Sequence, residues 1–350
     1  MIVLVTGGAG YIGSHAVQRL LRDDHRVIAV DNLDRGHIQA IHALTAIAQG
    51  HLSFVQADIA ETRTLTQVMR ARKVDAVMHF AALAYVGESV DDPLWYYRNN
   101  AAGALSVLQA VDAAGVKRFV FSSTCATYGK PKPRYIPIPE TCPQAPINPY
   151  GRSKLQVEQM LFDYAASAER AGKSFAFAAL RYFNVAGSDR TGVLGEHHDP
   201  ETHLIPIILQ AMLGLRENVT IFGTNYDTPD GTCIRDYVHV EDLIDAHVAV
   251  LEALEPGDTR AYNLGIGKGY SVRQVINAAK RVTGRKIEIV EGPRRPGDPP
   301  RLFADPAKIK SELKWTAKIR NIDEIIASAW DWFEKHPRGY ETRAGVTSAT

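Results

Sequence analysis

Residues 1–13 read MIVLVTGGAGYIG, and this opening decides the fold. The apolar run Ile2–Thr6 predicts a buried strand, and the apolar pattern of Ser14–Asp23 predicts a helix directly after it. The glycines between them permit a tight turn and a close approach of the backbone to a phosphate group, which would meet free N–H groups at the start of the helix. These glycines are Gly7, Gly10 and Gly13. A strand, a glycine turn and a helix in this order predict a dinucleotide-binding site.

Strand and helix patterns alternate through the first half of the chain. Further strands are predicted at Arg26–Asp31, Leu52–Gln56, Asp75–Phe80, Lys117–Ser122 and Phe175–Arg181. Further helices are predicted at Gly36–Gln49, Thr62–Arg70, Trp95–Ala114 and Tyr150–Ala171. Such alternation predicts a parallel sheet with helices on both faces, which is an α/β, doubly wound, Rossmann-type fold.

The second half is less regular, and it predicts a smaller lobe. We expect residues 1–184 to form the dinucleotide-binding domain, rejoined by about residues 236–256. Residues 185–340 should form a mixed α/β lobe for the substrate, with helices at Ser271–Thr283 and Asn321–His336. Residues 341–350 are small and polar and should form a frayed tail.

Composition excludes several classes of protein. The chain has 350 residues, 45% of them hydrophobic, and a net charge of +1 with no basic run, so we expect no nucleic-acid partner. No apolar stretch reaches the roughly 18 residues that a membrane-spanning helix needs. Three cysteines, Cys125, Cys142 and Cys233, are too few and too scattered for a disulfide framework. We therefore expect a cytoplasmic enzyme that does not bind membranes.

The second predicted strand ends in Asp31-Asn32, 18 residues after Gly13. A carboxylate there can accept hydrogen bonds from both hydroxyls of an adenosine ribose and would repel a 2′-phosphate, which favours NAD over NADP. Asp58 follows the third strand, where the adenine edge would lie. It can contact the adenine or cap a helix, and the sequence leaves both readings open.

Tyr150 and Lys154 are four residues apart at the start of a predicted helix, so their side chains share one face. A free phenol has a pKa of about 10, and a nearby ammonium group favours its ionised form, so the pair predicts a tyrosine that exchanges protons. Thr124 follows the strand that contains Ser122 and can hold a substrate oxygen in line with the phenol.

The ordered motifs of the chain resemble the extended short-chain dehydrogenase/reductases and, within them, the UDP-glucose 4-epimerase family. The resemblance runs from Ile2 to about Tyr340. Its motifs are His79-Phe80-Ala81-Ala82, Val86-Gly87-Glu88-Ser89, Tyr96-Tyr97-Arg98-Asn99-Asn100, Asn148-Pro149-Tyr150-Gly151, Arg181-Tyr182-Phe183-Asn184, Asp230-Gly231-Thr232 and Arg235-Asp236-Tyr237.

The resemblance implies that Tyr150 takes the proton of the sugar 4-hydroxyl while hydride passes from C4 to NAD. The 4-keto sugar then turns on its UDP anchor and is reduced on its other face. It also implies a homodimer built on the helices near Trp95–Ala114 and Tyr150–Ala171.

The same resemblance assigns the ligand contacts. For NAD they are Gly7, Gly10, Tyr11, Ile12, Gly13, Asp31, Asn32, Asp58, Ile59, Phe80, Ala81, Ala82, Asn99, Ser122, Tyr150, Lys154 and Tyr182. For the UDP-sugar they are Thr124, Tyr150, Asn184, His203, Leu204, Thr220, Ile221, Phe222, Arg235, Arg295, Asp298 and Leu302. Among these, Arg235 and Arg295 suit the diphosphate, because a guanidinium group binds phosphate oxygens in a bidentate fork.

The residues after Thr124 help to distinguish which reaction the site catalyses. A dehydratase would need an acid and a base there, and a decarboxylase a glutamate, whereas this chain has Cys125 and Ala126. An epimerase therefore fits better than a sugar-nucleotide dehydratase or reductase. UDP-xylose and UDP-arabinose stay open as substrates, because residues 122–129 also resemble pentose epimerases. N-acetylhexosamines stay open because Leu302 neither clearly admits nor excludes an N-acetyl group.

The chain departs from the family's pattern at Ala84, where a lysine is frequent, and at His203, where an asparagine is frequent. His203 lies near His197 and His198, and three histidines can suggest a metal. Their segment has no cysteine and no regular ligand spacing, so we expect no metal site.

Overall fold

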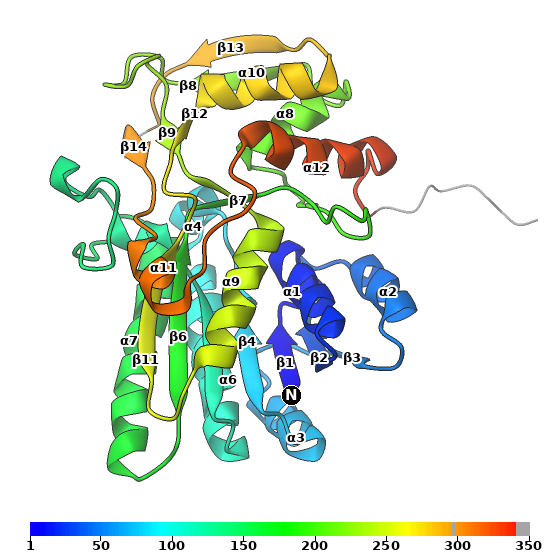
Figure 1. The fold of residues 1–350 in the computed structure, drawn as a ribbon, viewed down its shortest axis with the longest axis vertical. Coiled ribbons are helices and arrows are strands. Elements are labelled where there is room, and N and C mark those ends of the chain that lie inside the picture. The colour runs from blue at the N-terminus through cyan, green and yellow to red at the C-terminus, as the bar shows by residue number, and fades with distance from the viewer. Residues whose placement is uncertain (296–297, 341–350) are drawn as a thin grey trace, which may run out of the picture.

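The computed structural model describes residues 1–295 and 298–340 of the chain. Its centre is a parallel sheet with the strand order β11-β6-β5-β4-β1-β2-β3 (Figure 1). The strands are β1 (Ile2–Thr6), β2 (Arg26–Asp31), β3 (Leu52–Gln56), β4 (Ala76–His79), β5 (Arg118–Thr124), β6 (Ala176–Tyr182) and β11 (Thr259–Leu264). The chain order reverses between β1 and β4, which is where a doubly wound sheet opens its ligand crevice. The predicted doubly wound α/β fold is confirmed.

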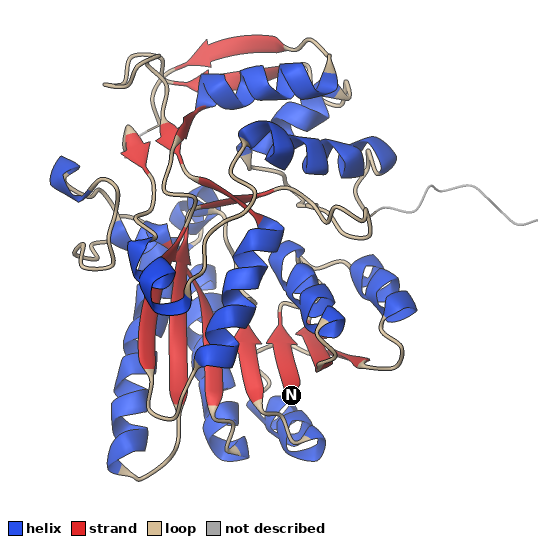
Figure 2. Cartoon of the chain, in the orientation of Figure 1, coloured by secondary structure: helices blue, strands red, loops and turns tan. Residues whose placement is uncertain are grey.

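Helices cover both faces of this sheet (Figure 2). One face packs against α1 (Tyr11–Arg22), α2 (Ile38–Ile47) and α9 (Val240–Ala253). The other face packs against α3 (Thr62–Arg72), α6 (Gly103–Ala114) and α7 (Pro149–Arg170). The strands are apolar on both faces because both are buried, which is why their sequences read as continuous apolar runs.

The prediction of one continuous α-helix over Trp95–Ala114 is wrong. Helix α4 (Val86–Asp91) is followed by α5 (Pro93–Tyr96), and a π-helical segment, Tyr97–Ala102, separates α5 from α6. Asn100 in that segment donates to the carbonyl oxygen of Leu83 at 2.9 Å and accepts from its backbone N–H at 2.8 Å. These long-range bonds stabilise a local conformation that helix periodicity does not encode, and such segments are frequent at functional sites.

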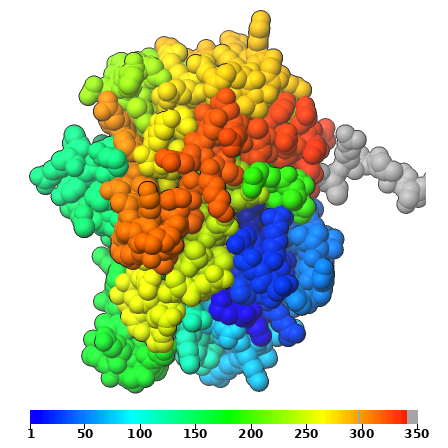
Figure 3. Space-filling model, in the orientation of Figure 1, coloured from blue at the N-terminus to red at the C-terminus, as the bar shows by residue number. Residues whose placement is uncertain are grey.

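Most of the remaining elements form a smaller lobe at the carboxyl ends of the strands (Figure 1), and this lobe packs directly on the larger one (Figure 3). Its helices are α8 (Leu204–Met212), α10 (Val272–Thr283) and α12 (Ile322–Lys335). Its strands are β7 (Asn184–Ala186), β8 (Asn218–Phe222), β9 (Ile234–Arg235), β10 (Tyr237–His239), β12 (Tyr270–Ser271), β13 (Glu288–Gly292) and β14 (Arg301–Leu302). Helix α11 (Ala307–Leu313) instead packs against α9 and β11 of the large domain. Short 3-10 turns lie at Cys125–Tyr128 and Pro133–Tyr135.

The chain returns from this lobe to the large sheet through α9 and then β11, which pairs with β6 at the edge of the sheet. The return therefore extends to Leu264, beyond the predicted limit near residue 256. No strand was predicted for Thr259–Leu264. The predicted tail at 341–350 lies outside the described residues. Within the described part of the chain, no helix has both the length and the apolar character required to cross a membrane.

Candidate active site

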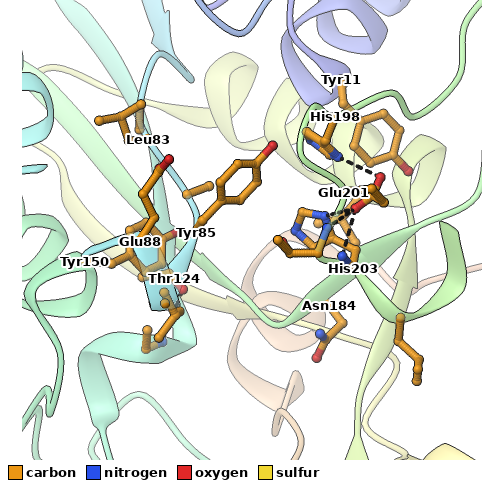
Figure 4. A pocket seen from close by; sticks show the side chains of 18 of the residues that line it. Tyr11, Leu83, Tyr85, Glu88, Thr124, Tyr150, Asn184, His198, Glu201 and His203 are labelled. Carbon is orange, nitrogen blue, oxygen red and sulfur yellow. Dashed lines mark hydrogen bonds and ion pairs between the residues drawn. The ribbon is translucent and has the colours of Figure 1, made fainter. Parts of the chain in front are cut away.

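A cavity of about 1620 Å³ lies where the small lobe meets the carboxyl ends of the strands, and both lobes line it. Single small-molecule pockets usually measure about 300–1,000 Å³, so this cavity has room for two large ligands side by side. Figure 4 shows Tyr150 and Thr124 on one side and His198, Glu201 and His203 on the other, with Asn184 below His203 and Tyr85 between the two groups.

The glycine turn forms one end of the cavity. Gly7 has a φ of +70°, and a Cβ there would lie 2.7 Å from the backbone nitrogen of Ala81. A Cβ on Gly13 would lie 2.0 Å from the carbonyl oxygen of Gly7, so neither position accommodates a side chain. Helix α1 begins after Gly10 with no side-chain cap, which leaves its first N–H groups for an anion. This turn fits the pyrophosphate of a dinucleotide.

Asp31 stands at the end of β2 in a fixed orientation. Its carboxylate accepts hydrogen bonds from the backbone N–H of Ala9 at 3.0 Å and of Leu33 at 2.9 Å. Burial raises the pKa of this carboxyl group, and the two N–H groups counteract that effect. Arg35 pairs with Glu88 at 2.6 Å, so its charge is already engaged. This arrangement fits the ribose hydroxyls of NAD.

Asp58 does not line the cavity. Its carboxylate accepts from the backbone N–H of Ala60 at 2.8 Å and from the Asn32 side chain at 2.9 Å. It is also not a helix cap, because α3 begins at Thr62 with Glu61 before it. Asp58 instead shapes its own turn and orients Asn32, which does line the cavity.

Tyr150 and Lys154 lie on the first two turns of α7, which begins at the capping residue Asn148. Lys154 is buried and donates a hydrogen bond to the carbonyl oxygen of Ser122 at 2.8 Å, which ties it to the end of β5. Burial lowers the pKa of Lys154 to about 7, although Glu158 opposes the shift. Burial raises the pKa of the Tyr150 phenol. The raised pKa favours the neutral phenol near pH 7, so positive charge beside it is needed before it can act as a base.

The predicted UDP contacts line the other end of the cavity, with one exception. In β8 the side chains alternate, so Thr220 and Phe222 reach the cavity while Ile221 is buried in the core. Arg295 lies over the ring of Phe222, with 4.1 Å from its guanidinium carbon to the ring centroid. The predicted diphosphate ligand Arg235 forms an ion pair with the predicted ribose ligand Asp298. The two groups thus neutralise each other.

The remaining predicted contacts line this one cavity. They are Gly7, Gly10, Tyr11, Ile12, Gly13, Asp31, Asn32, Ile59, Phe80, Ala81, Ala82, Asn99, Ser122, Thr124, Tyr150, Lys154, Tyr182, Asn184, His203, Leu204, Thr220, Phe222, Arg235, Arg295, Asp298 and Leu302. They come from strand ends and loops that are far apart in the sequence, and the fold brings them together. Whether each contacts a ligand stays a prediction.

The model of the NAD dependent epimerase/dehydratase family matches residues 3–265. The chain belongs to this family. It is 47% identical over 344 residues to a UDP-glucose 4-epimerase of Lactobacillus helveticus, covering 98% of this chain and 100% of that protein. It is 46% identical over 344 residues to a probable UDP-arabinose 4-epimerase 3 of Oryza sativa subsp. japonica, covering 97% of this chain and 83% of that protein.

A solved structure of another family member has the same fold. UDP-glucose 4-epimerase from Bifidobacterium longum, in complex with NAD⁺ and UDP, superimposes with a TM-score of 0.91 at 39% identity. The match covers 97% of this chain and 100% of that one. Both the sheet and the smaller lobe are therefore common to the two proteins.

Several cavity residues of the present chain were not assigned to the site by the sequence analysis, although Glu88 belongs to one of the family motifs quoted there. Tyr85 and Glu88 line the cavity, and the Tyr96 hydroxyl donates to Glu88 at 2.7 Å while accepting from the Tyr85 N–H at 2.9 Å. Both belong to the segment that connects β4 with α5. That segment follows β4, whose carboxyl end lies at the edge of the crevice. This position in the sequence could have indicated that its side chains reach the site.

Glu196 and Glu201 were also missed. Each is buried, and each lies within 3.4 Å of a histidine nitrogen. Burial alone would lower the pKa of His198, but the two carboxylates outweigh it and raise that pKa to about 9. The segment between β7 and α8 therefore holds a compact group of Glu196, His198, Glu201 and His203 on the cavity wall.

Proposed function

We propose that this chain is an NAD-dependent UDP-sugar 4-epimerase that interconverts UDP-glucose and UDP-galactose. The observation that carries the proposal is that one cavity is lined by the proton-exchange pair Tyr150 and Lys154 and by the anion-binding groups Arg235 and Arg295. The relative from Lactobacillus helveticus, which this chain covers fully, is named for this activity. We assign the NAD site to residues 1–184 with 236–256, and the UDP site mainly to residues 185–340.

The chain's own residues supply the proton transfer and the anchoring. NAD, when bound at the glycine turn, supplies the acceptor and then the donor of the hydride at C4 of the sugar. Tyr150 takes the proton of the 4-hydroxyl in the first half of the reaction and returns it in the second, so one residue serves both directions. Lys154 in its protonated form contributes positive charge that lowers the pKa of the phenol, and Thr124 holds the sugar oxygen beside it. The arginines retain the UDP while the sugar turns.

The sugar is the open part of the proposal. Leu302 pairs with Arg235 in the β14–β9 ladder and lines the cavity, so its side chain is placed to limit the size of the sugar. The Oryza sativa relative is named for UDP-arabinose. We therefore keep UDP-xylose and UDP-arabinose, alone or beside the hexoses, as the second candidate, and N-acetylhexosamines as the third.

Incubation of the purified protein with UDP-galactose, without added NAD, should yield UDP-glucose until the two reach equilibrium. The panel should also contain UDP-glucose, both N-acetyl forms, UDP-xylose and UDP-arabinose, with the products separated by chromatography. Preferential conversion of the pentoses would move the assignment to the second candidate. Failure to interconvert any of these sugars at C4 would refute the function.

A sugar-nucleotide dehydratase or reductase is the more distant alternative. Cys125 occupies the position where the dehydratases carry an acid, and burial raises the pKa of its thiol to about 12. A thiol with that pKa is neutral near pH 7 and a poor proton donor. Loss of water or net consumption of NAD(P)H in the same assay would support this alternative instead.

We infer that the enzyme is a homodimer packed through α6 and α7. Leu105 on α6 and Phe162 on α7 are 45% and 42% exposed in the single chain, and an interface across these two neighbouring helices would bury both. Leu105→Glu would place a charge in the proposed interface. Sedimentation should show a dimer for the wild-type chain and a monomer for Leu105→Glu. Leu215→Glu, which alters a 52% exposed leucine outside these helices, is the control and should remain dimeric.

We also propose a cytoplasmic location and a role in galactose metabolism. All three cysteines are free, which suits a reducing compartment. Cell fractionation followed by the UDP-galactose assay would test both statements, and activity confined to an extracytoplasmic fraction would contradict the first.

A further inference from the structure

Four side chains with metal-binding atoms meet on the cavity wall opposite Tyr150. They are Glu196, His198, Glu201 and His203, and one ligand atom from each lies within 4.8 Å of all the others. Figure 4 shows His198, Glu201 and His203 turned toward one another beside Tyr11. We propose that these four side chains bind a divalent transition-metal ion, with Zn²⁺ as the best match.

The distances between the donor atoms are those of a coordination sphere. In a tetrahedral zinc site with bonds of about 2.0–2.1 Å, neighbouring donors are separated by about 3.3–3.4 Å. Nδ1 of His198 lies 3.4 Å from a carboxylate oxygen of Glu196 and 3.4 Å from one of Glu201. Nδ1 of His203 lies 3.4 Å from the same Glu196 oxygen, Oε1, and 3.0 Å from Oε1 of Glu201, whereas His198 faces Oε2 of Glu201. Both imidazoles thus point the same nitrogen at the same pair of carboxylates.

A network of ordinary ion pairs explains these contacts less well. Hydrogen bonds between a cationic nitrogen and a carboxylate usually measure about 2.7–2.9 Å, which is shorter than all four distances. Only the contact of 3.0 Å between His203 and Glu201 is short enough to count as a hydrogen bond. Nδ1 of His198 is buried and makes no hydrogen bond within the described part of the chain. A buried ring nitrogen that faces two carboxylates without bonding to either has the position of a metal ligand.

Charge and burial support the same assignment. Glu196 and Glu201 are only 3% and 8% exposed, and two carboxylates buried side by side repel each other. A divalent cation would neutralise both, and imidazole nitrogen with carboxylate oxygen is a donor set that zinc accepts. Glu201 is further oriented by the backbone N–H groups of Thr202 and His203, at 2.8 and 2.7 Å, which is the support that metal-binding carboxylates commonly have.

The site is structural in character, because four protein ligands complete a tetrahedral zinc ion and leave no position for a reactant. His203 is the N-cap residue directly before α8, and the other three ligands precede it in the segment after β7. The ion would therefore fasten the segment of residues 196–203, which contributes to the cavity wall, to the start of α8. This assignment does not depend on the sugar that the enzyme converts. It reverses our expectation of no metal, which considered the histidines without Glu196 and Glu201.

Calorimetric titration of the chelator-treated full chain with Zn²⁺ should show about one tight site per chain, and Zn²⁺ should raise its midpoint of thermal unfolding. Glu196→Gln and His203→Asn each remove a ligand with little change of shape, and each should weaken binding by at least about tenfold. Co²⁺ should give the intense visible absorption of a tetrahedral site in the wild-type chain, which tests the geometry without any variant.

Two controls exclude binding elsewhere. His25→Asn disrupts a second group, Asp23, His25 and Glu252, and His42→Asn removes an exposed histidine of α2. Both controls should bind Zn²⁺ as the wild type does. The proposal is overturned if the wild type binds Zn²⁺ no better than folded Glu196→Gln, if His25→Asn or His42→Asn abolishes binding, or if Co²⁺ shows no tetrahedral absorption.

Discussion

Tyr150→Phe is expected to retain NAD and to lose about 10²–10⁴-fold in turnover of UDP-galactose, which is the usual contribution of a positioned acid or base. The substitution removes only the hydroxyl that exchanges the proton with the sugar 4-hydroxyl. The phenylalanine ring can keep the packing against Tyr96, whose ring centroid lies 6.5 Å away in an edge-on arrangement. This variant should therefore bind NAD as the wild type does and yet convert UDP-galactose much more slowly.

The measurements are the steady-state rate with UDP-galactose and the NAD released when the protein is denatured. Tyr164→Phe is the matched control, since Tyr164 is on the same helix and its hydroxyl donates to Asp112 at 2.9 Å, away from the cavity. This control should keep its activity. Full activity of Tyr150→Phe would remove the phenol from the mechanism, whereas loss of NAD would mean that the residue mainly holds the cofactor.

Arg181→Met is expected to lower the free energy of unfolding by about 3–5 kcal/mol, because it leaves a buried carboxylate without its partner. Arg181 and Glu158 are both buried, and the guanidinium reaches the carboxylate at 2.6 and 3.0 Å. Glu158 also accepts from Ser123 and, at 3.0 Å, from Gln144. This network joins α7 to β5 and β6 one turn beyond Lys154, so it helps to position the catalytic helix.

Urea unfolding followed by fluorescence would measure the change. Arg190→Met is the matched control, because Arg190 pairs with Glu241 at 2.7 Å while 66% of its side chain remains exposed. Exposed ion pairs contribute about 0–1 kcal/mol, so this variant should be nearly as stable as the wild type. Equal losses of unfolding free energy in the two variants would show that the buried Arg181–Glu158 pair contributes no more to stability than an exposed pair.

Most of the fold could be predicted because it depends on short-range patterns in the sequence. Buried parallel strands and the helices between them have distinct periodicities, and the glycine turn joins the first pair. The π-helical segment at Tyr97–Ala102 was missed because long-range hydrogen bonds of Asn100 stabilise it, and these are invisible in a local pattern. β11 was missed because its residues Thr259–Leu264 are only half buried and lack a clear alternation.

The candidate site, like the fold, could be predicted from the sequence only in part. Asp31, Tyr150 and Lys154 could be predicted because each stands at a defined place beside a strand or at the start of a helix. The mutual pairing of Arg235 with Asp298 could not, because the two residues are 63 positions apart and only the folded lobe brings them together.

The sequence by itself thus determined the order of strands, turns and helices, the dinucleotide turn and the one-turn spacing of Tyr150 and Lys154. These depend on φ and ψ preferences and on periods of two and 3.6 residues, which act between near neighbours. The tertiary structure alone decided that Glu196 joins His198, Glu201 and His203 around one point, with Thr220 facing the cavity and Ile221 the core. Such groupings follow from how segments pack and from the direction in which each side chain leaves its backbone, and neither is visible until the chain is folded.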